Sequence, residues 1–216
     1  MDKKKQYTLV FTLMAAILIV DQVVKIMVKT HLFMGQEIPL IGDWCLLHFT
    51  ENEGFAFGTT LGGKGGKLVL TLFRLIASAG ILWYLLRSMK KGMRTSLAVC
   101  VSLILVGAVG NLIDSCFYGV LFSESTFHVA MLFPPDGGYA PLLQGKVVDM
   151  FYFPLFEFDW PQWVPFVGGK HFLFFDAIFN VADAAITVGA FWLCIDVLVQ
   201  DHKKKLAKEQ AENQKT

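Results

Sequence analysis

The chain has 216 residues, of which 55% are hydrophobic and 17% charged, and its mean hydropathy is +0.53. Soluble globular domains carry about 25% charged residues, so this composition argues against a soluble domain with a buried core. The formal net charge of +1 gives no reason to expect a nucleic-acid partner.

The apolar residues gather into four long runs. A helix needs about 20 predominantly apolar residues to cross a bilayer, and each run approaches that length. The runs cover residues 7–28, 68–86, 97–113 and 177–199. Lys3 to Lys5 precede the first run, as in a signal peptide, but no small-residue cleavage site follows it, so we expect a retained helix. The sequence therefore predicts one mainly α membrane domain over residues 1–216, with four transmembrane helices.

Basic residues indicate the orientation of these helices. They cluster before the first run, between the second and third, and after the last, at Lys3–Lys5, Arg87–Arg94 and Lys203–Lys208. The positive-inside rule places these clusters, and with them both termini, in the cytoplasm. Residues 30–67 and 115–176 then lie outside, where the alternation around 44–49 predicts a small β-rich segment. The aromatic run 151–163 suits either the lipid headgroup region or a small external core.

Polar residues interrupt the four runs. An ionisable side chain inside a span costs about 2.5 to 3.5 kcal/mol, so each needs a reason. With the orientation above, the polar residues lie near the outer ends of the helices: Asp21, Lys25, Arg74, Asn111, Asp114, Asn180 and Asp183. Several carboxylates at one depth favour a functional cluster, although Asn111, Asn180 and Thr187 also suit hydrogen bonding between helices.

Helical spacing predicts which of these residues share a face, because residues three and four apart lie on the same side of a helix. One stripe on the fourth helix contains Asp176, Asn180, Asp183 and Thr187. Another, at the end of the third helix, contains Gly107, Asn111, Asp114 and Tyr118. Asp21 and Lys25 are one turn apart, a spacing that allows them to pair.

Two carboxylates held close together share a proton, because both cannot ionise cheaply. The ionised member can then take a proton from water while the protonated member supports the developing oxyanion, which is peptide hydrolysis without a metal or a covalent intermediate. These considerations alone do not show which two carboxylates form the pair.

Five motifs make the chain resemble the bacterial lipoprotein signal peptidases (signal peptidase II) over nearly its whole length. In chain order they are Asp21–Lys25, Asn52–Gly58, Gly107–Asp114, Val147–Asp149 and Phe179–Asp183. The resemblance implies that Asp149 and Asp183 are the catalytic pair. It also implies supporting roles for other motif residues, namely Asp21, Lys25, Asn52, Gly54, Asn111, Asp114 and Asn180.

The resemblance further implies a substrate and a location. The substrate would be a prolipoprotein with a diacylglyceryl group on its lipobox cysteine, cut just before that cysteine. The enzyme would lie in the bacterial inner membrane among its lipids, with the active site facing the periplasm. It would need no cofactor, and the cyclic peptide globomycin would inhibit it.

The chain departs from the family pattern in two places. The family usually has Arg directly after the position of Asp114, where this chain has Ser115. We hypothesise that Arg74, at similar depth on the second helix, supplies the missing charge. The second departure is an insertion over about 123–144, which would serve as a lid, a substrate-selecting surface or an idle loop.

Three alternatives stay open. A transporter or channel subunit would use intramembrane Asp and Asn equally well, and Asp149 would then be dispensable. A Ser/Lys membrane peptidase would use Ser115 and Lys146. A purely structural helix bundle would leave the gathering of carboxylates unexplained.

The cysteines and histidines give little evidence for a disulfide or a metal site. Cys45 and Cys116 lie on the side expected to be oxidising, so a disulfide between them is conceivable. The histidines show no metal-ligand spacing, and we expect no metal site.

Overall fold

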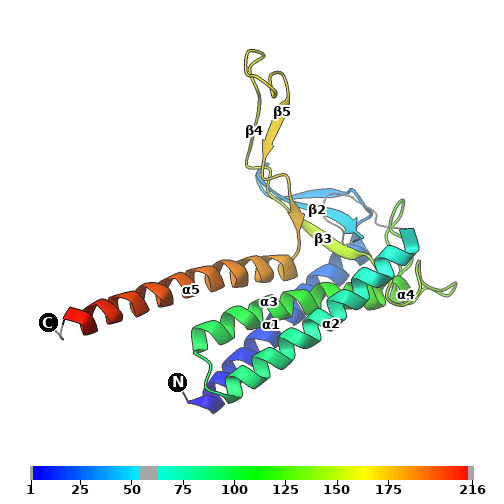
Figure 1. The fold of residues 1–216 in the computed structure, drawn as a ribbon. Coiled ribbons are helices and arrows are strands. Elements are labelled where there is room, and N and C mark those ends of the chain that lie inside the picture. Colours follow the sequence, from blue (N-terminus) through cyan, green and yellow to red (C-terminus); the bar gives the residue numbers. More distant parts are fainter. Residues whose placement is uncertain (1, 54–62, 214–216) are drawn as a thin grey trace. The chain divides into compact units, whose positions relative to one another are not determined.

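The computed structural model describes residues 2–53 and 63–213 (Figure 1). Within these ranges, four long helices dominate: α1 (Lys3–His31), α2 (Gly63–Lys90), α3 (Thr95–Ile113) and α5 (Val181–Asn213). Each belongs to a segment long and apolar enough to cross a membrane. The prediction of four transmembrane helices is therefore confirmed, while the side on which the termini lie stays a prediction.

The third membrane segment is longer than predicted. After α3 the chain continues as the π-helical η2 (Asp114–Tyr118) and the short α4 (Gly119–Leu121). Helix α3 ends at Ile113, where the third run was expected to end, and the candidate span continues from Thr95 to Leu121. Asp114 and Tyr118 lie in this continuation, and both side chains are buried and hydrogen-bonded to Gln22 of α1.

The second and fourth helices also begin at other residues than predicted. Helix α2 starts at Gly63, five residues before the predicted run. Helix α5 starts only at Val181, because Ile178–Phe179 form strand β6 instead. Asp176 and Asn180 therefore precede the helix, and the predicted helical stripe that contained them with Asp183 is wrong.

The β-structure is antiparallel and joins distant parts of the chain. Strands β1 (Glu37–Ile41), β2 (Cys45–Asn52), β3 (Val147–Tyr152) and β6 pair in the order β1-β2-β3-β6. Strand β2 confirms the β-rich segment expected around residues 44–49. Strand β3 was not predicted, and it places Asp149 opposite Thr50.

Strands β4 (Phe156–Asp159) and β5 (His171–Phe174) form a separate hairpin (Figure 1). Its aromatic rings contact one another: Phe156 stacks on Phe174 with ring centroids 4.6 Å apart. These rings stay substantially exposed, so they do not form a buried external core. A hydrogen bond with Asp159, reinforced by the charges of Asp159 and Glu157, raises the pKa of His171.

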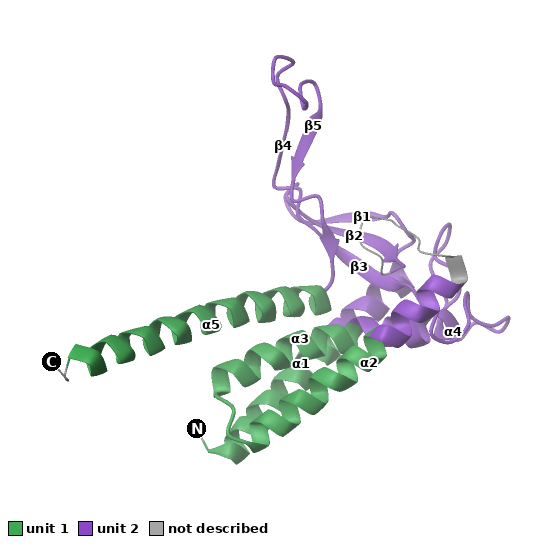
Figure 2. Ribbon diagram, in the orientation of Figure 1, with its two compact units in different colours: residues 1–20, 74–110, 181–216 green, residues 21–73, 111–180 purple. Residues whose placement is uncertain are grey.

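The chain divides into two compact units (Figure 2). Unit 1 comprises residues 1–20, 74–110 and 181–216, and unit 2 comprises residues 21–73 and 111–180. The division crosses α1, α2 and α3. The core of unit 1 centres on buried residues of α1, α2 and α3: Val10, Leu85, Met89, Ala98 and Leu105. The core of unit 2 joins α1 to the sheet through Val28, Leu32, Phe49, Val148 and Met150.

Glycine allows close helix packing inside unit 1. A Cβ atom on Gly107 of α3 would overlap the carbonyl oxygen of Ala182 and approach Ile186 Cγ1 of α5 to 2.6 Å. Small residues at such contacts let helix backbones approach in membranes. By contrast, a Cβ atom on Gly80 of α2 would meet nothing within 4 Å.

Gly107→Ala is therefore expected to lower the free energy of unfolding by about 1–3 kcal/mol, because the added methyl group overpacks the contact. Gly80→Ala, the matched control, should leave stability unchanged or raise it by about 0.5–1 kcal/mol, because alanine favours helix over glycine. Thermal unfolding in detergent measures both. Equal stability of the two variants would contradict the contact with α5.

Candidate functional site

Asp149 is held in strand β3 as a buried carboxylate. Its exposed fraction is 3%, and its neighbours Val148 and Met150 are completely buried. Asn180 Nδ2 donates hydrogen bonds to Asp149 Oδ1, at 2.6 Å, and to the Val148 carbonyl, at 3.3 Å. Asp149 lies outside every predicted span, and the pairing of β3 with β2 is what buries it.

Asn180 connects this carboxylate to the third helix. The residue lies just before α5 and is completely buried. Its Nδ2 also donates to Asn111 Oδ1 of α3, at 3.1 Å. The same oxygen accepts a hydrogen bond from Lys25 Nζ of α1, at 2.9 Å. A continuous chain of side chains therefore runs from Asp149 through Asn180 and Asn111 to Lys25.

Lys25 lies at the centre of a buried charged cluster. Its Nζ is 3.0 Å from Asp21 Oδ2 and 2.8 Å from Asp114 Oδ2, which confirms the pairing that the spacing allowed. With Asn111, these acceptors match the three N–H groups of the ammonium. All three charged side chains are at most 1% exposed, so each depends on the others for the interactions that water would otherwise provide.

Asp114 also joins this cluster to the sheet. Its Oδ2 accepts a hydrogen bond from the Val148 backbone N–H, at 3.2 Å, and Val148 directly precedes Asp149. Its Oδ1 accepts from Gln22 Nε2, at 3.0 Å, and Gln22 Oε1 accepts from the Tyr118 hydroxyl, at 3.2 Å. Sequence reasoning missed Gln22, although the residue stands inside the first motif, between Asp21 and Lys25.

The structure thus brings together six of the residues singled out from the sequence, all in unit 2: Asp21, Lys25, Asn111, Asp114, Asp149 and Asn180. The others lie elsewhere. Asp183 is half-buried in the first turn of α5, and Arg74 is half-buried on α2, both in unit 1. Asn52 is exposed at the end of β2, and Gly54 lies outside the described residues. The pairing of Asp149 with Asp183 stays a prediction.

A second buried cluster was missed from the sequence. Lys29, one turn after Lys25 on α1, is completely buried and forms an ion pair with Glu51 of β2. Its Nζ donates to Ser125 Oγ, at 2.7 Å, and lies 4.9 Å from the centre of the Tyr139 ring. Ser125 and Tyr139 belong to the insertion over 123–144, so Lys29 attaches the insertion to both the helix and the sheet.

Lys146, two residues after the insertion, strengthens this attachment. Its Nζ lies 3.3 Å from Glu51 Oε2 and 3.5 Å from Glu124 Oε1. Burial alone would lower the pKa of Lys146, but the charges of Glu51 and Glu124 outweigh it and raise the pKa.

A cationic Lys146 engaged by two carboxylates is a poor general base. Ser115 Oγ donates to the Asn111 carbonyl, at 2.9 Å, so the structure does not favour the Ser/Lys alternative.

The sequence left a disulfide between Cys45 and Cys116 open, and the structure does not contain it: all four cysteines, each within the described residues, are free. In the same part of the chain, no three His, Cys, Asp or Glu side chains are grouped so that they could hold a metal ion.

The fold and the site define a class: a polytopic membrane protein with a buried carboxylate on a strand next to the ends of its spans. A bacterial membrane enzyme solved by the in meso method has a similar fold, with a TM-score of 0.59 and 23% identity, covering 91% of this chain and 92% of that chain. The sequence profile described as "Signal peptidase (SPase) II" matches residues 13–199. The chain belongs to the signal peptidase II family, a family of aspartic peptidases.

Two relatives that are named lipoprotein signal peptidases support the assignment to this family. A lipoprotein signal peptidase of Porphyromonas gingivalis is 44% identical over 196 residues, which cover 90% of this chain and 85% of the relative. One from Amoebophilus asiaticus is 35% identical over 181 residues, which cover 82% and 72% respectively. The likeness extends over most of the chain in both cases.

Replacing Lys25 by methionine is expected to lower the free energy of unfolding by about 3–5 kcal/mol, because Asp21 and Asp114 would remain buried without their cation. Combining Lys25→Met with Asp114→Asn should recover part of this loss, because one uncompensated charge is removed. Denaturation in detergent measures the effect. As a control, Asp159→Asn alters an exposed ion pair and should change nothing measurable. A Lys25→Met protein as stable as the parent would exclude a structural role for the cluster.

Proposed function

We propose that the chain removes signal peptides from diacylglyceryl-modified prolipoproteins, cutting before the lipidated cysteine, with Asp149 and Asp183 as the catalytic pair. The observation that carries this proposal is the hydrogen bond from Asn180 to the buried carboxylate of Asp149. Asp183 follows Asn180 by three residues, which limits their Cα separation to roughly 11 Å in any backbone conformation. The contact of Asn180 with Asp149 therefore supports a role for both aspartates at one site.

In the proposed reaction the two carboxylates share one proton. The ionised carboxylate accepts a proton from water as the water oxygen attacks the scissile carbonyl carbon. The protonated carboxylate donates to the carbonyl oxygen and so stabilises the negative charge that develops there. Collapse of the tetrahedral intermediate then breaks the C–N bond, and a proton passes to the leaving amine of the cysteine.

Asn180 is proposed to orient Asp149 for this reaction. Its donated hydrogen bond restricts rotation of the carboxylate, and Asn111 in turn restricts Asn180. Lys25 is linked to Asp149 through these two amides, and through Asp114 to the backbone of Val148, so we assign it a positioning role. Because Lys25 already gives Asp114 a cation, that carboxylate does not require Arg74. The proposed compensation of Ser115 by Arg74 stays a prediction.

We further propose that the protein lies in the bacterial inner membrane with this site on the periplasmic side. The basic residues flanking the spans support this orientation. A substrate anchored by its own acyl chains would reach a site at the outer ends of the helices without leaving the bilayer. The relatives named lipoprotein signal peptidases support the same class of substrate.

Asp149→Asn and Asp183→Asn are each expected to lower the rate of cleavage by about 10²- to 10⁴-fold or more, because each removes one partner of the proton transfer. The assay uses purified full-length protein and a synthetic diacylated prolipoprotein. Asp159→Asn, an exposed aspartate of the hairpin, is the matched control and should keep parental activity. Thermal unfolding of each variant distinguishes lost chemistry from lost fold. Cleavage that survives either substitution would contradict the assignment of the pair, and a parent protein that cleaves nothing would favour the transporter alternative.

Globomycin is expected to inhibit the parent protein, as the family resemblance implies. The measurement is the cleavage rate as a function of globomycin concentration, with an unrelated cyclic peptide as control. Undiminished cleavage at saturating globomycin would count against this expectation.

A further inference from the structure

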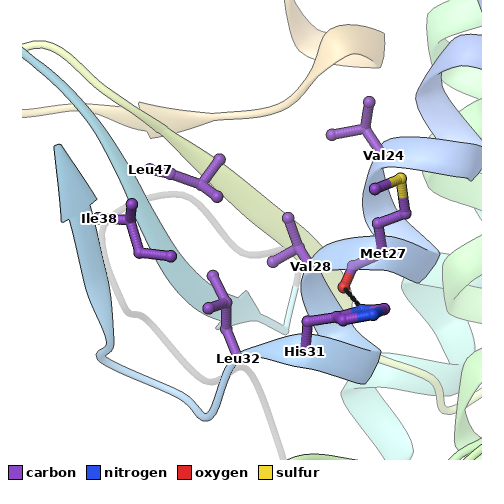
Figure 3. A pocket seen from close by; sticks show the side chains of 7 residues that line it. All are labelled: Val24, Met27, Val28, His31, Leu32, Ile38 and Leu47. Carbon is purple, nitrogen blue, oxygen red and sulfur yellow. Dashed lines mark hydrogen bonds between the residues drawn. The ribbon is translucent and has the colours of Figure 1, made fainter. Parts of the chain in front are cut away.

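An apolar groove opens beside the outer end of α1 (Figure 3). It has a volume of about 360 Å³, within the usual range of small-molecule pockets. One wall is the helix face formed by Val24, Met27, Val28 and His31, and the opposite wall includes Ile38 of β1 and Leu47 of β2. All of these residues belong to unit 2.

The lining indicates what the groove can hold. Apart from His31 its named side chains are hydrocarbon or thioether, and His31 Nδ1 donates to the Met27 carbonyl at 2.8 Å (Figure 3). An extended peptide would leave its backbone N–H and C=O groups without partners on such walls, which is costly. A saturated acyl chain has no hydrogen-bonding groups, so it leaves no polar group without a partner in the groove. The flexible Met27 side chain also adapts to a flexible ligand.

The place of the groove favours a lipid held near Asp149. The candidate span of α1 ends at His31, so the groove lies along the last turns of this span. Leu47 pairs with Phe151 of β3, and Phe151 is two residues from Asp149, roughly 7 Å along the strand. On α1, Val24 and Val28 directly precede Lys25 and Lys29, whose buried side chains belong to the two polar clusters. The helix thus offers the polar network and the apolar groove on adjacent faces.

We propose that this groove binds one acyl chain of the diacylglyceryl group carried by the substrate. The inference rests on the proposed function. A chain seated between Met27 and Leu47 positions the glyceryl-bearing cysteine within reach of Asp149, so the lipid itself sets the place of the scissile bond. Met27, Ile38 and Leu47 are then residues that determine specificity for lipidated substrates.

The first test compares Met27→Trp, which fills the groove, with Ile26→Trp on the neighbouring helix face. Both positions are exposed, at 58% for Met27 and 37% for Ile26, so neither substitution disturbs a core. Substrates with long and with short acyl chains are cleaved by each protein. Met27→Trp should raise KM for the long-chain substrate about 10-fold or more, because several CH₂ groups lose their buried site, and leave kcat unchanged. Ile26→Trp should match the parent.

The second test identifies the occupant by photocrosslinking in the full-length protein. A diacylated prolipoprotein with a diazirine in one acyl chain should label the segments that contain Met27 and Leu47, and Met27→Trp should lose this label. A diazirine phospholipid that labels the same residues and is not displaced by the substrate would show a bilayer lipid instead, and would overturn the proposal.

The outcomes separate this inference from the proposed function. Parental KM and an unchanged preference for long chains in Met27→Trp would overturn the acyl site, while loss of cleavage in Asp149→Asn would still support the peptidase. Cleavage retained in Asp149→Asn would instead overturn the proposed function.

Discussion

The ammonium of Lys25, held between Asp21 and Asp114, is the interaction on which the organisation of unit 2 depends. Three charges without access to water are tolerable only when they satisfy one another, and an incomplete set would carry a penalty of several kcal/mol. Each member comes from a membrane-spanning segment that also contributes to the site. The requirement to complete this cluster therefore fixes how the C-terminal end of α1 lies against the end of α3.

The charged cluster is also connected to the sheet. Asp114 uses one carboxylate oxygen for both Lys25 and the backbone N–H of Val148, so the strand that carries Asp149 is attached to the charged cluster. Asn111 and Asn180 provide a second connection, through side-chain amides. Hydrogen bonds in such a water-excluded environment are strong and directional, and they hold a carboxylate more firmly than a solvated loop would. The polar side chains whose burial in the spans costs free energy are thus the ones that hold Asp149 and its strand through hydrogen bonds.

The insertion over 123–144 uses the same principle one helical turn further along α1. Buried Lys29 pairs with Glu51 and contacts Ser125 and Tyr139, so the extra segment is attached by charge and hydrogen bonds. Lys29 and Glu51 were not singled out beforehand, because their relation appears only when β2 lies against α1. Likewise Gln22 is an unexceptional polar residue until Asp114 and Tyr118 are both within its reach.

The sequence by itself determined the four membrane segments, the pairing of Asp21 with Lys25 and the polar face of Asn111 and Asp114, because these depend on run length and helical spacing within one segment. Only the tertiary structure decided that Asp149 is buried, that Asn180 precedes α5 and that the third span reaches Leu121. The first two features depend on β3 pairing with β2 and β6, and the third accompanies the contacts of Asp114 and Tyr118 with Gln22 of α1; in each case the residues lie far apart along the chain. No local periodicity records such a pairing, since it forms only when distant segments meet.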